Sequence, residues 1–76
     1  MDNNQIQELI RSFLDDVSDL SISGQDCNFS IKIVSKDFIN MSTLERHKSI
    51  MKLFSDLLQS GELHAISLDL KARSEV

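Results

Sequence analysis

The spacing of apolar residues changes three times along this chain, and this succession limits the folds that it can adopt. Apolar side chains recur every three or four residues over about residues 3–16, as in an amphipathic helix. They alternate with polar ones over 20–23 and 29–33, as in half-exposed strands. A second helical stretch covers 42–60, and a third alternating stretch covers 63–70. The predicted order is therefore helix, strand, strand, helix, strand.

Residues with known turn and cap preferences mark the limits of these segments. The first two strands are joined by a five-residue loop over 24–28, which predicts an antiparallel hairpin. Ser42 and Glu45 have the spacing of a capping box at the start of the second helix, and Gly61 can end it. We expect the inner side of this helix to carry Leu44, Met51, Phe54, Leu57 and Leu58.

The segment 35–41 is predicted to be a connector with room for one helical turn. Its Phe38 and Ile39 are too apolar to be left wholly in water, so we expect them to tuck under the second helix.

A chain of 76 residues can bury one core, so we expect a single domain over residues 1–76. A helix between the second and third strands must carry the chain back across one face of the sheet. The predicted fold class is α+β, with a three-stranded sheet and its helices on one face.

Several functional classes have no support in the sequence. The only glycines are Gly24 and Gly61, so there is no phosphate-binding glycine loop, and neither paired metal-spaced histidines nor a hydrolase elbow is found. We therefore do not expect an independent enzyme. The lone Cys27 indicates a reducing compartment, and no run of ~18 apolar residues is present, so we expect a soluble cytoplasmic protein.

Cys27 and His64 are the residues whose chemistry suits a metal. Spacing by itself favours a partly buried structural role for His64, and Cys27 follows Asp26 without a positive neighbour to favour the thiolate. Together, a thiolate and an imidazole suit zinc, iron or an iron-sulfur cluster, but two ligands cannot complete a site. Any such metal must be shared with a partner.

Three stretches of the chain resemble the signature sequences of BolA-like proteins, in the order and spacing of that family. They are residues 33–38 (Ile-Val-Ser-Lys-Asp-Phe), 46–48 (Arg-His-Lys) and 63–68 (Leu-His-Ala-Ile-Ser-Leu). The chain departs from the family at Asn40, where glycine is common.

The resemblance implies a fold similar to the type II KH domain and a non-enzymatic adaptor. The implied partner is a monothiol glutaredoxin, and the implied cofactor is a bridged 2Fe-2S cluster to which the histidine of the His-Ala pair, His64, is a ligand. Cys27 is the residue of the hairpin loop able to serve as a second ligand. The implied role lies in iron-sulfur cluster trafficking, iron homeostasis or the stress response.

Two other hypotheses stay open. The first is a DNA-binding transcription regulator with a KH-like fold that uses Arg46, Lys48 and Lys52, although a run of this kind is usually only a solvated helix face. The net charge of −4 opposes binding to phosphate backbones, and 38–42 lacks the Gly-x-x-Gly loop of RNA-binding KH domains, so RNA binding is not expected. The second is a scaffold in which His64 packs and Cys27 has no role. Alone, the chain is expected to be a monomer or a homodimer.

Overall fold

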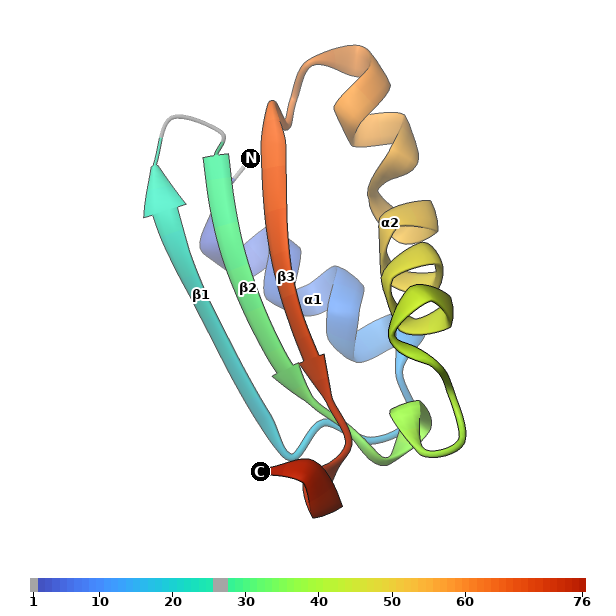
Figure 1. Ribbon diagram of the computed structural model, residues 1–76. Coiled ribbons are helices and arrows are strands. Elements are labelled where there is room, and N and C mark those ends of the chain that lie inside the picture. The colour runs from blue at the N-terminus through green and yellow to red at the C-terminus, as the bar shows by residue number, and fades with distance from the viewer. Residues whose placement is uncertain (1, 26–27) are drawn as a thin grey trace.

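The computed structural model describes residues 2–25 and 28–76 and confirms the predicted order of elements (Figure 1). The helices and strands are α1 (Asn3–Phe13), β1 (Asp19–Gln25), β2 (Asn28–Val34), α2 (Thr43–Ser60) and β3 (Ala65–Lys71). Two 3-10 turns, η1 (Lys36–Phe38) and η2 (Arg73–Glu75), follow β2 and β3. Among the described residues, no helix is long and apolar enough to span a bilayer.

The first helix is shorter than the predicted range of 3–16. It ends at Phe13 because Leu14 adopts an extended backbone, with its N–H still donating to the Ile10 carbonyl. Leu14 is nevertheless buried, so the apolar periodicity continued beyond the last helical residue. Helical spacing reports which side chains face the core, and it does not by itself fix where the helix stops.

β2 is the central strand of the sheet. β1 pairs with it antiparallel, as the hairpin prediction required, and β3 pairs with it parallel. The register aligns Ile22 with Ile31 and Ile31 with Leu68, which places the apolar side chains of all three strands in rows on one face. A parallel return to a neighbouring strand needs a crossover connection, which α2 supplies.

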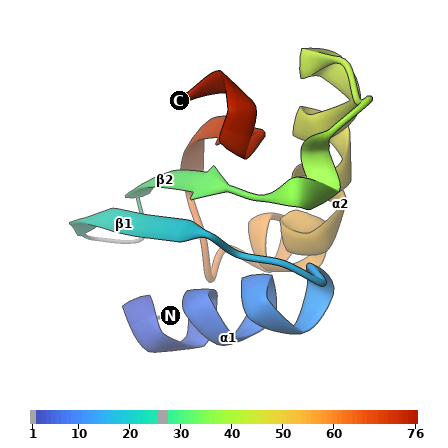
Figure 2. The same cartoon turned by 90° about the horizontal axis from the view of Figure 1, so that it is seen from below.

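Both helices pack on the apolar face of the sheet. α2 runs beside β3 (Figure 1), α1 lies across this face, and the C-terminal turn lies on the side of the sheet opposite α1 (Figure 2). The largest fully buried side chains are those of Phe38, Phe54, Ile6, Ile10, Ile31, Ile33, Ile50, Leu63 and Ser35.

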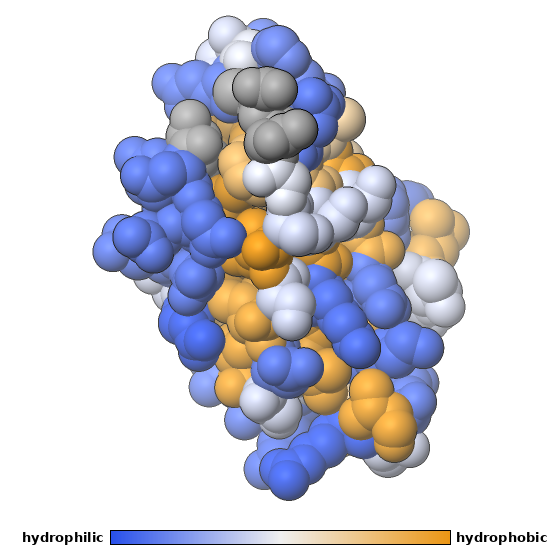
Figure 3. Space-filling view, turned by 90° about the vertical axis from the view of Figure 1, so that its left-hand side faces the viewer, coloured by the Kyte–Doolittle hydropathy of each residue, from blue (hydrophilic) through white to orange (hydrophobic). Residues whose placement is uncertain are grey.

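The β1 side of the molecule is less completely covered. Figure 3 looks onto this side and shows apolar surface flanked by polar surface. Four partly buried residues of α1, β1 and the segment between them pack against the core, namely Leu9, Val17, Leu20 and Ile22.

The ends of α2 match the sequence prediction. The Ser42 hydroxyl accepts a hydrogen bond from the Glu45 N–H at 3.1 Å, and the Glu45 carboxylate accepts one from the Ser42 N–H at 2.8 Å. Gly61 ends the helix in the left-handed conformation, with φ of 85°. Asn40 also has a positive φ of 68°, which explains why asparagine can stand where the family commonly has glycine.

The prediction of which α2 residues face the core was partly wrong. Leu44 is 61% exposed, whereas Ile50 is fully buried. The buried residues Arg46, Ile50 and Phe54 recur every four residues and form the core-facing side. Leu44 precedes Ile50 by six residues, about one and two-thirds turns, so it points to a different side of the helix.

The connector before α2 also differs in part from expectation. Phe38 is fully buried within η1, as predicted, but Ile39 is 50% exposed.

Ser35, at the end of β2, joins two connectors. Its hydroxyl donates to the Asp16 carbonyl at 2.5 Å and accepts from the Asp37 N–H at 3.0 Å. The Asp37 carboxylate in turn accepts from the Asp15 N–H at 2.9 Å. Because Ser35 is fully buried, its two hydrogen bonds satisfy a hydroxyl group that is itself shielded from water.

We expect Ser35→Ala to destabilise the fold by about 1–3 kcal/mol, because it leaves the Asp16 carbonyl without its donor in a buried setting. The measurement is urea unfolding followed by far-ultraviolet circular dichroism. Ser12→Ala, at an exposed position of α1, is the matched control. Equal stability of the two variants would contradict this role of Ser35.

A second polar feature, buried on its arginine side and exposed on its carboxylate side, joins α2 to the C-terminal turn. The Arg46 guanidinium forms a two-bond ion pair with the Glu75 carboxylate, with N–O distances of 2.6 and 3.0 Å. It also donates to the Met41 and Leu70 carbonyls and lies 5.8 Å from the centre of the Phe38 ring. Only 8% of Arg46 is exposed, so this ion pair, the Arg46–Glu75 clasp, is part of the fold.

The clasp makes stability depend on pH. The hydrogen bonds from Arg46, followed by that from the Ala72 N–H, lower the pKa of Glu75 from 4.5 to about 2. Because the folded pKa is the lower one, the stabilisation is complete above pH 4.5 and is lost as the pH falls toward 2.

We therefore expect Glu75→Gln to lower the free energy of unfolding at pH 7. The difference in free energy of unfolding between wild type and this variant should shrink as the pH falls from 4.5 to 2. Urea unfolding across this range measures both. Glu8→Gln, which removes an exposed carboxylate with no ion pair among residues 2–25 and 28–76, is the control. A stability difference that does not change with pH would rule out the clasp as its source.

Candidate functional site

The connection between α2 and β3 fixes the position of His64. Gly61 turns the chain out of the helix, and the Leu63 N–H donates to the Leu57 carbonyl at 3.0 Å. Leu63 is 1% exposed and anchors the connection in the core. His64 is therefore held by a buried residue before it and by the first strand residue, Ala65, after it.

The His64 side chain itself is exposed. In the part of the chain that the structure describes, it has no hydrogen-bond partner. Spacing by itself favoured a partly buried, structural histidine, and this expectation was wrong. The alternating stretch was expected from residue 63, but β3 begins two residues later, at Ala65, so His64 precedes the strand. The imidazole is available to a ligand or a partner.

The end of β1 and the start of β2 lie at the same end of the molecule as the start of β3 (Figure 1), and His64 directly precedes β3 in the sequence. Ala65 pairs with Asn28, so the residues that directly follow His64 and Cys27 in the sequence are neighbours across the parallel ladder. Cys27, the second predicted ligand, lies outside the described residues. Gly24 helps to shape the hairpin: its φ is 132°, and a Cβ there would lie 2.1 Å from the Asn28 carbonyl oxygen.

The described residues contain no group of three or more histidine, cysteine, aspartate or glutamate side chains able to hold a metal ion. A metal bound at His64 would therefore need ligands from outside this part of the chain.

The predicted basic contact face is not assembled as expected. Lys48 and Lys52 are exposed on α2, but Arg46 is buried in the Arg46–Glu75 clasp and does not lie beside them. The reason is the spacing of the helix, which places Arg46 in line with the buried Ile50 and Phe54. DNA binding stays a prediction, now without Arg46 on its contact face.

Comparison with solved structures places the fold among BolA proteins. BolA1 from Arabidopsis thaliana superposes with a TM-score of 0.85 at 29% identity, covering 100% of this chain and 99% of that one. The BolA domain of SufE1 from the same organism gives a TM-score of 0.84 at 30% identity, with the same coverage.

Sequence comparison agrees with the structural likeness. A BolA-like protein of Dictyostelium discoideum is 27% identical over 74 residues, covering 86% of this chain. The alignment spans 65% of the length of that relative, so about a third of it has no counterpart here. The family model described as "BolA-like protein" matches residues 7–75, which include α2, β3 and His64. The chain therefore belongs to the BolA-like protein family.

Proposed function

We propose that this chain is an adaptor that binds a monothiol glutaredoxin and supplies His64 as a ligand to a 2Fe-2S cluster held between the two proteins. The observation that carries the proposal is the exposed imidazole of His64, next to the buried Leu63 in a BolA-like fold. The cluster is the cargo, and its trafficking, in iron homeostasis or the stress response, is the proposed role.

The chemistry of the donors supports this cargo. Imidazole nitrogen replaces thiolate on one iron of some 2Fe-2S clusters, where it raises the reduction potential. His64 has no hydrogen bond to another described residue that would have to be broken first. The buried Leu63 next to His64 limits the movement of the His64 backbone. This lowers the conformational entropy that His64 loses when it binds the cluster.

Cys27 is the proposed second ligand of this chain. It stands between the described strands β1 and β2, one residue before Asn28, and Asn28 pairs with Ala65 beside His64. A thiolate at this position would add a soft ligand suited to iron. Further ligands would come from the glutaredoxin and its glutathione. In this proposal the chain binds and orients the cluster and catalyses no reaction.

A role in DNA binding has less support. Two exposed lysines of α2, Lys48 and Lys52, remain for phosphate contacts once Arg46 is assigned to the clasp, and the net charge of −4 opposes association with DNA.

The proposal predicts that His64→Ala removes the effect of this chain on a glutaredoxin-bound cluster. A monothiol glutaredoxin reconstituted with iron, sulfide and glutathione is mixed with each variant, and visible circular dichroism is recorded. Wild type should change the cluster spectrum, and His64→Ala should not. Glu62→Ala, two residues earlier at an exposed position, is the control and should behave as wild type. A spectrum that wild type leaves unchanged would reject cluster sharing.

A separate prediction concerns Cys27. If its thiolate is a second ligand, Cys27→Ser should give a shared cluster with an altered spectrum that is lost more rapidly to a chelator than the wild-type cluster. An unaltered spectrum and rate of loss would leave His64 as the ligand from this chain and remove Cys27 from the site.

A further inference from the structure

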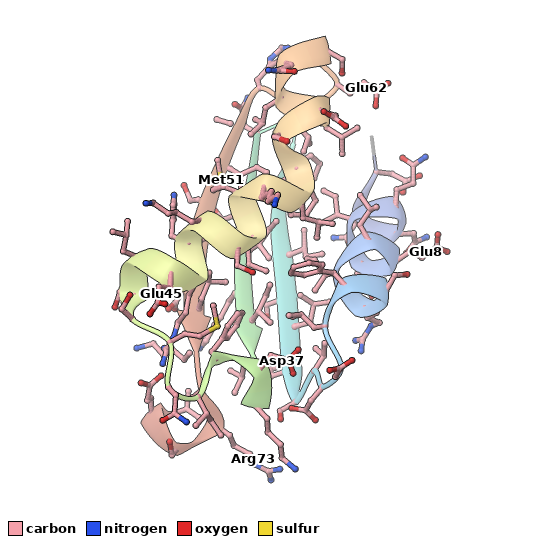
Figure 4. All side chains as sticks on the ribbon, turned by 90° about the vertical axis from the view of Figure 1, so that its right-hand side faces the viewer. Glu8, Asp37, Glu45, Met51, Glu62 and Arg73 are labelled. Carbon is pink, nitrogen blue, oxygen red and sulfur yellow. The ribbon has the colours of Figure 1, made fainter. Side chains whose placement is uncertain are left out.

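One side of α2, next to its core-facing side, carries an apolar stripe that the proposed cluster site does not use. Leu44, Met51 and Leu58 recur every seven residues, about two turns, so they line one side of the helix. Leu44 is 61% exposed, and Met51 and Leu58 are half-buried, with Leu58 also packing against the hydrophobic core. Met51 lies near the middle of α2, with Glu45 near its start and Glu62 beyond its end (Figure 4).

The stripe is bordered by cationic side chains. A shallow hollow on this side is lined by His47, Lys48, Met51, Lys52, Ser55 and Leu58, and none of these residues is acidic. Lys48 and Lys52 form no ion pair within residues 2–25 and 28–76. The carboxylate of Glu45, in the first turn of α2, is bonded to the Ser42 N–H. We call this surface, with Leu44, the α2 stripe.

A contrasting surface lies between the two helices. It is lined by Leu9, Leu53 and Leu57 together with Glu8 and Asp56, and no lysine or arginine lines it. The hollow at the α2 stripe therefore combines apolar residues with lysines and no lining carboxylate, although the net charge of the chain is −4. Because the charge at the α2 stripe is positive while that of the whole chain is negative, this surface favours binding partners that carry negative charge.

We propose that the α2 stripe is a docking site for an amphipathic helix of a partner protein whose apolar residues are flanked by aspartate or glutamate. Three apolar residues at heptad spacing match the apolar side of such a helix. Lys48 and Lys52 supply the complementary charge along one border. The inference does not depend on the proposed cluster site, because it uses no residue of that site.

The same features disfavour other occupants. A second copy that paired its own α2 stripe around a twofold axis would bring Lys48 and Lys52 close to their like-charged counterparts. DNA would place phosphates against Met51 and Leu58, which offer no hydrogen bonds. An acidic amphipathic helix satisfies both the apolar residues and the lysines.

The test uses a labelled synthetic helical peptide with leucine at heptad positions flanked by glutamate. A second peptide has lysine in place of each glutamate. Fluorescence anisotropy measures binding to the full chain, and amide chemical shifts locate it. We expect the acidic peptide to bind with shifts along α2, and the basic peptide to bind at least about tenfold more weakly.

The charge reversal Lys48→Glu/Lys52→Glu should weaken binding of the acidic peptide by about tenfold or more. Met51→Ser should weaken it without a change in charge. The matched control is Lys32→Glu/Lys36→Glu, which reverses two exposed lysines outside α2 and should bind as wild type. His64→Ala should also bind as wild type, so failure of the cluster proposal and failure of this one are distinguishable.

Several results would overturn the proposal. They are equal binding of the acidic and basic peptides, amide shifts confined to other elements, or no binding of the acidic peptide. Binding of duplex DNA or of phosphatidylserine vesicles that is lost in Lys48→Glu/Lys52→Glu, without binding of the acidic peptide, would assign the α2 stripe to a nucleic acid or a membrane surface instead.

Discussion

The parallel pairing of β2 with β3 decides where the functional residues lie. Because parallel neighbours run in one direction, the start of β3 must come to the same end of the sheet as the start of β2. The start of β2 follows the hairpin that contains Cys27, and the start of β3 follows His64. α2 is the crossover that makes this pairing possible, and its outer side faces away from the core as a consequence.

Two partly buried polar clusters hold together the segments at the opposite end of the molecule. Ser35 connects the segment before β1 to the segment after β2, and the Arg46–Glu75 clasp connects the start of α2 to the C-terminal turn. Both are well satisfied with hydrogen bonds, which is the condition for buried polar groups to be tolerated. The polar groups of this end are therefore bonded to one another, whereas His64 lies at the other end with its imidazole exposed.

The basic residues near the start of α2 have two different roles. Arg46 is structural, since its guanidinium is used within the fold, whereas Lys48 and Lys52 remain exposed. The planar guanidinium, with its several donors, suits simultaneous bonding to a carboxylate and to two carbonyls. A lysine ammonium, strongly hydrated, is suited to a solvent-facing surface such as the α2 stripe.

The sequence by itself determined the order of elements, the capping of α2 at Ser42 and Gly61, and the family, because these rest on local spacing and short motifs. It also singled out His64. Only the tertiary structure decided that His64 is exposed, that Leu44 faces solvent and that Arg46 is buried. Arg46 and Glu75 are 29 residues apart, and no local pattern reports a contact formed only when β3 returns beside α2. Exposure and long-range pairing depend on how elements pack, which periodicity does not encode.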